Sequence, residues 1–277
     1  MNLLKQAALS FERLKEIKYR IVLSAGLNKP LEEIVINFYD EDLFHILGLQ
    51  HLSDIDIPKN KKKLLTQILE GKITDEYLLK KMVTHIGTQK IETERLILRR
   101  FDYADIDSML RNWIADEKTQ WDYGEPYYST PEAVRELFDT KYIASYSRDN
   151  YYRWAVIEKE SQECIGQIAY FKVDTDNQHG EIEYVIGPSF QGKGYATEMT
   201  RAVIAYGFEK INFNRVEIDC RTENEASRRV IEKCGLTCEG VFRDFFWRKD
   251  HFEGRRVFSI LKQEYMYNKS SKIATND

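Results

Sequence analysis

The sequence predicts an α/β chain in which a small α+β unit precedes a larger domain. From residue 93 onward, apolar runs of strand length alternate with segments whose apolar residues recur at helical spacing. One such strand, residues 182–186, leads into a turn with two glycines, and the turn opens a helix from Tyr195 to about Phe208. Residues 83–90 form the join between the two parts.

The small unit covers residues 1–85 and is followed by a linker at 86–92. Turn residues at 26–30 separate two strand-like runs, at 19–24 and 33–39, so we expect a hairpin there. Helical patterns are expected at 3–17, 40–48, 61–69 and 74–82.

The larger domain covers residues 93–267, and residues 268–277 are expected to be a flexible tail. Between two expected helices, at 102–114 and from 130, lies a loop rich in aromatic and turn residues, 121–128. Its strands are expected at 94–101, 152–159, 163–173, 181–186, 215–220, 237–246 and 255–261, and a short helix at 225–233.

Composition narrows the classes of function. The chain has 277 residues, of which 43% are hydrophobic, and a net charge of −4, which gives no basic footprint for DNA. No apolar run is long enough to span a bilayer and the start lacks a signal peptide, so we expect a cytoplasmic protein without a membrane contact. The four cysteines and five histidines show no zinc-site spacing, and we expect no metal.

The segment Gln191-Gly192-Lys193-Gly194-Tyr195-Ala196 is the strongest functional signal. A strand–turn–helix geometry directs several main-chain N–H groups and the positive end of a helix dipole toward one point. Glycines let the backbone approach an anion without a Cβ in the way. The segment therefore predicts a phosphate or diphosphate site, although an ordinary glycine turn would have the same pattern.

The Gln-x-x-Gly-x-Ala pattern of this turn resembles the acyl-CoA loop of the GCN5-related N-acetyltransferase (GNAT) superfamily. Four phrases resemble its Rim-type branch, which includes ribosomal-protein alanine N-acetyltransferases: 93–99, 181–188, 192–198, and 224–227 with 232–235. The resemblance spans about residues 91–267. It implies the GNAT fold, a mixed and mostly antiparallel central sheet flanked by helices, in which the fourth and fifth strands splay apart.

The resemblance implies acetyl-CoA as the co-substrate. The main-chain N–H groups of the turn, Gln191, Gly192, Lys193, Gly194, Tyr195 and Ala196, would hold its diphosphate. The main chain of Tyr184, Val185 and Ile186 would pair with the pantetheine arm and the acetyl carbonyl. Asn224 would hydrogen-bond the same arm, and as the residue before a helix it is also a natural N-cap.

The implied chemistry is direct attack of an amine on the thioester, which needs alignment, a base and donors for the oxyanion. Glu181 and Glu183 share a face of the fourth strand by alternation, and Asp219 lies on the fifth strand. Each is a candidate base, and each is equally a solvated or ion-paired strand residue. Ser227 matches a serine near the CoA sulfur, whereas Ile231 stands where many relatives have a tyrosine acid.

The acceptor groove is expected to be lined by Trp121, Tyr123, Tyr127 and Tyr128, whose rings add contact area and polar tips. The resemblance favours a protein or peptide α-amine as acceptor and leaves small amines as the alternative. A monomer and a homodimer both remain open, as does contact with RNA or the ribosome.

Residues 35–49 and 60–63 resemble part of a phage-associated group, the barnase–EndoU–colicin–RelE-like nuclease domains, over about residues 19–73. The chain passes into the second domain where such domains usually continue, so we expect a truncated or repurposed unit. His45 and His51 are its acid–base candidates. The alternatives to an acetyltransferase are thus a nuclease- or toxin-related protein and a non-catalytic acyl-CoA-binding module.

Overall fold

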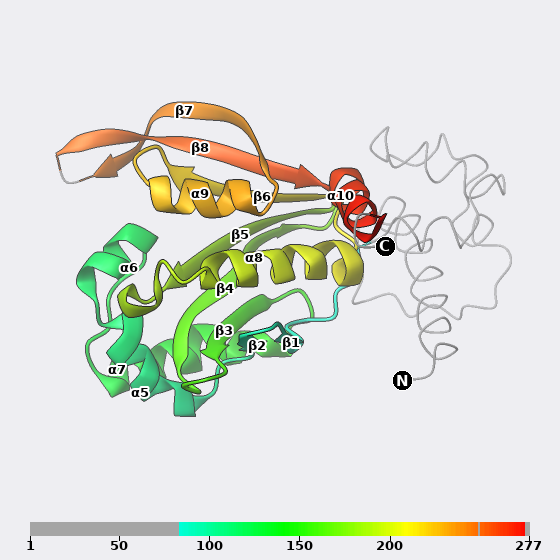
Figure 1. The fold of residues 1–277 in the computed structure, drawn as a ribbon. Coiled ribbons are helices and arrows are strands. Elements are labelled where there is room, and N and C mark those ends of the chain that lie inside the picture. Colours follow the sequence, from blue (N-terminus) through cyan, green and yellow to red (C-terminus); the bar gives the residue numbers. More distant parts are fainter. Residues whose placement is uncertain (1–82, 249, 275–277) are drawn as a thin grey trace, which may run out of the picture. The chain divides into compact units, whose positions relative to one another are not determined.

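The computed structural model describes residues 83–248 and 250–274. The chain divides into two compact units, Met1–Met82 and Val83–Asp277, and the described residues belong to the second (Figure 1). The hairpin and helices expected in the first unit, with His45 and His51, lie outside the described residues.

The described part of the second unit is built on an eight-stranded sheet with the order β1-β2-β3-β4-β5-β6-β8-β7. Every neighbouring pair is antiparallel except β5 and β6, which are parallel. The sheet is therefore mixed and mostly antiparallel, as predicted. Its strands are β1 Ile91–Glu92, β2 Leu96–Arg99, β3 Tyr152–Glu158, β4 Cys164–Asp174, β5 His179–Ile186, β6 Arg215–Arg221, β7 Thr237–Arg248 and β8 His251–Leu261.

Helices cover both faces of this sheet. The helix α8 (Tyr195–Tyr206) lies in front of it in Figure 1, beside α9 (Glu225–Lys233). Their face holds one buried cluster that includes Trp154 and Met199, and the opposite face, with α5 (Ile106–Met109) and α7 (Pro131–Leu137), holds a second that includes Ala155 and Phe138. Strand alternation explains the division, because Trp154 and Ala155 are neighbours on β3.

The remaining helical segments are short. They are η3 Tyr103–Asp105, η4 Leu110–Ile114, α6 Glu117–Tyr123, η5 Phe138–Tyr142, η6 Ala144–Ser147, η7 Pro188–Phe190, η8 Gly207–Ile211 and α10 Lys262–Ala274. Among the described helices, none combines the length and apolar character that a bilayer crossing requires.

The strands β5 and β6 separate soon after they begin. They pair only where His179–Glu181 of β5 meets Arg215–Glu217 of β6. Beyond that point β5 continues to Ile186 while paired with β4 alone in the described structure. The family's fourth and fifth strands correspond to β5 and β6 here. The splay predicted between them is confirmed, and it leaves one edge of β5 open.

Two predicted elements differ from the structure, the loop at 121–128 and the helix at 102–114. Residues 121–123 of the expected loop are the last residues of helix α6. Asp116 caps this helix by accepting a 2.7 Å hydrogen bond from the Thr119 N–H, and Gly124 ends it at φ +90°. The expected helix 102–114 is divided into the 3₁₀ segment η3, the helix α5 and the π-helical segment η4.

Both ends of the described unit are more ordered than expected. In the predicted linker, Ile91–Glu92 form β1, and the Gly87 carbonyl accepts a 2.7 Å hydrogen bond from the Tyr206 hydroxyl. The expected flexible tail from residue 268 is helical to Ala274, and the Lys269 ammonium pairs with Glu209 at 2.5 Å. Both segments are held by tertiary contacts, which cannot be recognised from local sequence composition.

Candidate functional site

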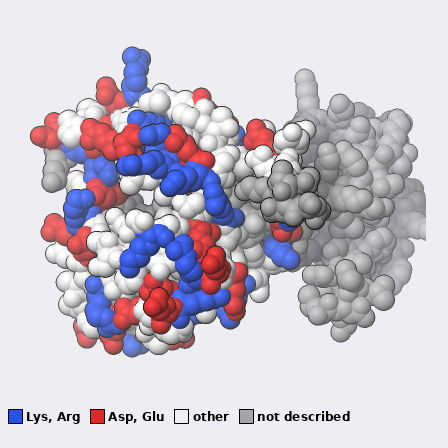
Figure 2. Space-filling model, viewed as in Figure 1, with Lys and Arg blue, Asp and Glu red and all other residues white. Residues whose placement is uncertain are grey.

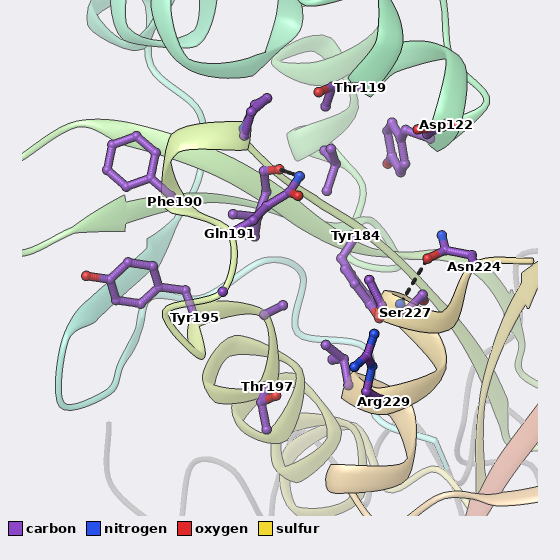
Figure 3. Close-up of a pocket in the computed structure, with 18 of the residues that line it drawn as sticks. Thr119, Asp122, Tyr184, Phe190, Gln191, Tyr195, Thr197, Asn224, Ser227 and Arg229 are labelled. Atoms are coloured by element: carbon purple, nitrogen blue, oxygen red, sulfur yellow. Dashed lines mark hydrogen bonds between the residues drawn. The ribbon is translucent and has the colours of Figure 1, made fainter.

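A cavity of about 960 Å³ opens where β5 and β6 separate. Figure 3 shows α6 on one side of it and the first turns of α8 and α9 on the other, with Thr119 and Asp122 facing Gln191 and Ser227. Its lining joins residues from five parts of the chain: residues 116–123 around α6, the end of β5, the glycine turn with the start of α8, the end of β6, and α9. The point where β5 and β6 separate is called the fork below. The cavity at the fork thus extends from the glycine turn to α6.

The glycine turn has the backbone that an anion cradle requires. Gly192 and Gly194 have φ of +76° and +85°, and a Cβ built on Gly192 would meet no atom within 4 Å. Because α8 begins at Tyr195, its first N–H groups lack intrahelical acceptors. The Gln191 side chain closes the turn onto the strand by donating a 2.9 Å hydrogen bond to the Ile186 carbonyl. These features fit a diphosphate.

Arg95, which the sequence reasoning did not single out, holds this turn in place. Its guanidinium donates a 2.9 Å hydrogen bond to the Lys193 carbonyl and lies 4.6 Å from the centre of the Tyr195 ring. The same group forms an ion pair of 2.6 Å with Glu198, whose carboxylate also accepts from the Thr93 hydroxyl. Glu94 and Arg95, just before β2, were interpreted only as part of a strand pattern. Nothing in the local sequence distinguishes Arg95 from its neighbours as a residue that contacts the turn.

Asn224 and Ser227 occupy the start of α9 beside the open edge of β5. The Asn224 side chain caps the helix by accepting a 3.0 Å hydrogen bond from the Ser227 N–H. The Ser227 hydroxyl lies 2.9 Å from the Tyr184 hydroxyl, and all three residues line the cavity (Figure 3). Burial raises the pKa of Tyr184, so that phenol keeps its proton.

The Tyr184 side chain is a second functional group that sequence reasoning missed. Its main chain was expected to bind the co-substrate, but strand alternation also turns its side chain away from the face of Glu183 and toward α9, where it meets Ser227. The two hydroxyls together form a neutral proton donor beside the β5 edge. The alternation of side chains along the strand was the sequence feature that could have identified the Tyr184 side chain.

The α6 end of the cavity includes Asp122, a carboxylate that already has three cationic partners. Asp122 contacts the Lys118 ammonium at 2.7 Å, the Arg221 guanidinium at 2.9 Å and the Arg248 guanidinium at 3.2 Å. The Lys118 ammonium and the arginines keep the pKa of Asp122 below its usual value despite burial. This network ties α6 to the ends of β6 and β7, so the wall of the cavity is a fixed structure.

The three predicted carboxylate bases do not line this cavity. Glu181 is 2% exposed and pairs with Arg255 at 2.8 Å, and Asp219 contacts the same arginine. Glu183 pairs with Arg153 at 2.6 Å and lines a second cavity of about 430 Å³. The predicted common face of Glu181 and Glu183 is present, but Ser227 is the only one of the four catalytic candidates in the lining of the 960 Å³ cavity.

Asp219 has an unusual acidity. Burial raises the pKa of Asp219 to about 7, and the neighbouring Glu181 carboxylate adds to this effect while Arg255 opposes it. Two carboxylates share one guanidinium here, and their mutual repulsion disfavours the ionisation of Asp219. This environment makes Asp219 a proton acceptor near neutral pH, but outside the cavity lining.

The predicted groups for the acceptor and the co-substrate are only partly brought together. Tyr123 lines the 960 Å³ cavity, whereas Trp121 packs under Arg248 with 4.7 Å between ring and guanidinium, and Tyr127 is 53% exposed. Tyr128 lies beyond the cavity, where its N–H bonds the Ile114 carbonyl at 3.0 Å. Of the predicted co-substrate residues, the lining contains Tyr184, Val185, Ile186, Gln191, Gly192, Gly194, Tyr195, Ala196 and Asn224 but not Lys193.

Figure 2 shows Lys and Arg side chains in a band across the described part of this face, with Asp and Glu side chains beside the band. The charges on this face are therefore of both signs.

Known protein families match both units of the chain. Residues 95–237 match the model described as an acetyltransferase (GNAT) domain. Residues 3–106 match the model of a phage-Barnase-EndoU-ColicinE5/D-RelE like nuclease, a longer span than the 19–73 that the sequence predicted. The two matched spans overlap at 95–106, where the structure has β2 and the start of α5.

Several individual proteins resemble the second unit. The chain is 30% identical over 177 residues to an uncharacterized N-acetyltransferase p20 of Bacillus licheniformis, which covers 64% of this chain and 98% of that protein. It is 37% identical over 100 residues to a putative ribosomal N-acetyltransferase YdaF of Bacillus subtilis, 36% of this chain and 55% of that protein. It is 26% identical over 144 residues to a spermidine N(1)-acetyltransferase of Vibrio cholerae, 52% of this chain and 80% of that protein.

A solved structure agrees with these sequences. The crystal structure of a GNAT-family acetyltransferase from Bacillus anthracis superposes with a TM-score of 0.55 at 26% identity, over 64% of this chain and 100% of that one. The splayed sheet, the glycine turn and the family match point in the same direction. The chain belongs to the GNAT acetyltransferases, and it is an N-acetyltransferase.

Proposed function

We propose that the second unit transfers the acetyl group of acetyl-CoA to the N-terminal α-amine of a protein or peptide, by direct attack within a ternary complex. The observation that supports this most is the single cavity that joins the glycine turn to α6 through the fork between β5 and β6. Both substrates can meet there without a covalent enzyme intermediate.

The co-substrate would lie along the open edge of β5. The N–H groups of residues 191–196 would hold the diphosphate, with Gly192 allowing close approach. The main chain of residues 184–186 would hydrogen-bond the pantetheine arm and polarise the thioester carbonyl, which places the acetyl carbon at the fork. The Asn224 amide lies on the opposite wall.

Acetyl transfer forms a C–N bond and breaks a C–S bond, so one proton must leave the amine and the thiolate must gain one. The hydroxyl pair of Tyr184 and Ser227, 2.9 Å apart, is placed to supply the proton to the thiolate. Since the side chain of Ile231 is a hydrocarbon, it contributes no acid from α9, and we assign that role to the Tyr184–Ser227 pair.

The charges at the α6 end favour an acceptor with one positive charge over a polyamine. Asp122 is already in contact with three cations, Lys118, Arg221 and Arg248. A polyamine needs several free carboxylates along its length, whereas a peptide needs one place for its ammonium and polar groups for its backbone. Spermidine is nevertheless the substrate named for one relative, so a small amine is the alternative acceptor.

A mass-spectrometric acceptor screen with the full chain and acetyl-CoA tests the proposal. We expect mass gains of one acetyl group on peptides with a free N-terminus and none on the same peptides blocked by formylation. Preferential acetylation of spermidine would replace the proposed acceptor by the alternative. Acetyl-CoA binding in calorimetry without transfer to any amine would contradict the proposed activity itself.

We further propose a cytoplasmic enzyme, acting where acetyl-CoA is available, as a monomer or homodimer, with ribosomal proteins among the acceptors to be screened. The match of residues 3–106 to a nuclease family supports a second candidate activity, RNA cleavage. Incubating the full chain and its His45→Ala variant with RNA tests this. Cleavage by the parent chain that is lost in the variant would establish it, and equal absence of cleavage would remove it.

A further inference from the structure

The 960 Å³ cavity lacks a carboxylate base among the predicted candidates, yet the acceptor amine must lose a proton. The α6 side of this cavity includes Tyr123. Glu183 lines the separate cavity of about 430 Å³. Among the described residues, Tyr123 therefore belongs to the first lining and Glu183 to the second.

A chain of hydrogen bonds fixes both residues. The Tyr123 hydroxyl accepts a 3.1 Å hydrogen bond from the Gln167 amide, whose carbonyl accepts from Arg153 at 2.8 Å. Arg153 in turn donates a 2.6 Å hydrogen bond to one carboxylate oxygen of Glu183. Gln167 and Arg153 are 1% and 6% exposed, so the geometry is set by buried groups.

This arrangement determines the direction of the tyrosine proton. Because the hydroxyl accepts from Gln167, its own proton remains available for donation. Burial first, and the negative charge of Glu183 second, raise the pKa of Tyr123. Gln167 pairs with Val185 in the sheet, so Glu183, two positions along that strand, lies on the same face as the amide that holds the phenol. A phenol whose proton is available can donate to a carboxylate on that face, while its remaining lone pair can accept a proton from an amine in the cavity that Tyr123 lines.

We propose that Tyr123 and Glu183 form a relay that carries the proton of the acceptor amine from the reaction cavity to the second cavity. The inference rests on the proposed acetyl transfer. As the amine attacks, an N–H bond breaks and an O–H bond forms on Tyr123, while the original Tyr123 O–H bond breaks and one forms on Glu183. Tyr123 stays neutral throughout, and Glu183 gains one proton.

The second cavity gives this proton an exit to water. Its lining includes Arg148 and Asn150, which are exposed, beside Glu183. The relay therefore separates proton release from the entry of the acceptor. In this scheme Tyr123 touches the acceptor, whereas Glu183 acts through Tyr123.

Single and double variants of the full chain test the relay by steady-state kinetics with a peptide acceptor. We expect Tyr123→Phe and Glu183→Gln each to lower kcat about a hundredfold, the usual scale of acid–base contributions, with KM for acetyl-CoA within twofold of the parent. Because both residues serve one path, the double variant should be no slower than the slower single variant.

Two control variants remove the same kinds of side-chain group at positions outside both cavities. Tyr103→Phe removes a tyrosine–carboxylate hydrogen bond, with Asp139, and Glu217→Gln removes another carboxylate paired with an arginine, Arg215 of the same strand. Neither residue lines either cavity. Both control variants should keep kcat within twofold of the parent chain.

Chemical rescue distinguishes proton acceptance from support of Arg153. Formate should restore turnover to Glu183→Ala, where it can enter the space left in the second cavity, but not to Tyr123→Phe. An active parent chain whose Tyr123→Phe variant keeps more than half of kcat would overturn the relay, as would multiplied losses in the double variant or failed rescue of Glu183→Ala. A parent chain that acetylates no amine would instead refute the proposed function.

Discussion

Replacing Gly192 by alanine tests whether the glycine turn binds the co-substrate. Gly192 has φ +76° and lines the 960 Å³ cavity, and an added Cβ would meet no atom within 4 Å. The substitution therefore creates no clash in the protein itself. Its cost to folding comes from the left-handed backbone alone, about 1–2 kcal/mol for a residue with a Cβ.

Gly124 provides a matched control. It has φ +90°, an added Cβ there would also meet nothing within 4 Å, and it ends α6 outside the cavity lining. Gly124→Ala and Gly192→Ala should lower Tm by similar amounts, about 2–4 °C for each kcal/mol in a domain of this size. Thermal unfolding followed by circular dichroism measures this shared effect.

Only the Gly192 variant should weaken acetyl-CoA binding. The new methyl group occupies the space in which the diphosphate approaches the main-chain amides, and we expect a Kd at least tenfold higher, equivalent to about 1.4 kcal/mol. Isothermal titration calorimetry at one temperature compares the two variants. If Gly192→Ala binds acetyl-CoA within twofold of Gly124→Ala, the diphosphate does not lie against this turn and the reasoning is wrong.

Three further predictions follow from the site. Arg95→Ala removes the hydrogen bond to the Lys193 carbonyl and should weaken acetyl-CoA binding about five- to thirtyfold in calorimetry, equivalent to about 1–2 kcal/mol; an unchanged Kd would show that the turn holds itself. Ser227→Ala removes the partner of the Tyr184 hydroxyl and should lower kcat about tenfold without changing the Kd of acetyl-CoA, and an unchanged kcat would exclude the pair from thiolate protonation. The folded-state pKa of Asp219, about 7, lies above its unfolded value of about 3.9, so its contribution to stability is present below pH 4 and is lost as pH rises to 7. Melting curves of Asp219→Asn should lack this part of the slope, and parallel profiles of parent and variant would contradict the assignment.

The parts of the site that are contiguous in sequence were predictable. The turn at residues 191–196 combines a strand end, two glycines and a helix start within a few residues, so local chemistry alone reveals it. The open edge of β5 followed from the family resemblance, and the β5–β6 pairing confirms it. The N-cap of α9 at Asn224 was likewise readable from residue type and position.

The contacts that join distant segments were not predictable. Arg95 reaches a turn about 98 positions away along the chain, since its hydrogen bond is to Lys193, and no local pattern distinguishes it from other arginines at strand starts. The helix α6 was read as a loop because it is only seven residues long and its aromatic residues masked the cap at Asp116. With α6 missing from the prediction, Tyr123 had no defined direction.

The assignment of the base shows most clearly where local reasoning ends. Alternation correctly placed Glu183 and Glu181 on one face, but two carboxylates two positions apart acquire different roles from their partners. Glu181 is fixed by Arg255, whereas Glu183 is reached from the reaction cavity through Tyr123, a residue 60 positions earlier that α6 brings to the sheet. A base therefore has to be sought by following hydrogen bonds outward from the reacting atoms, because the carboxylate that receives the proton need not line the cavity in which the proton is released.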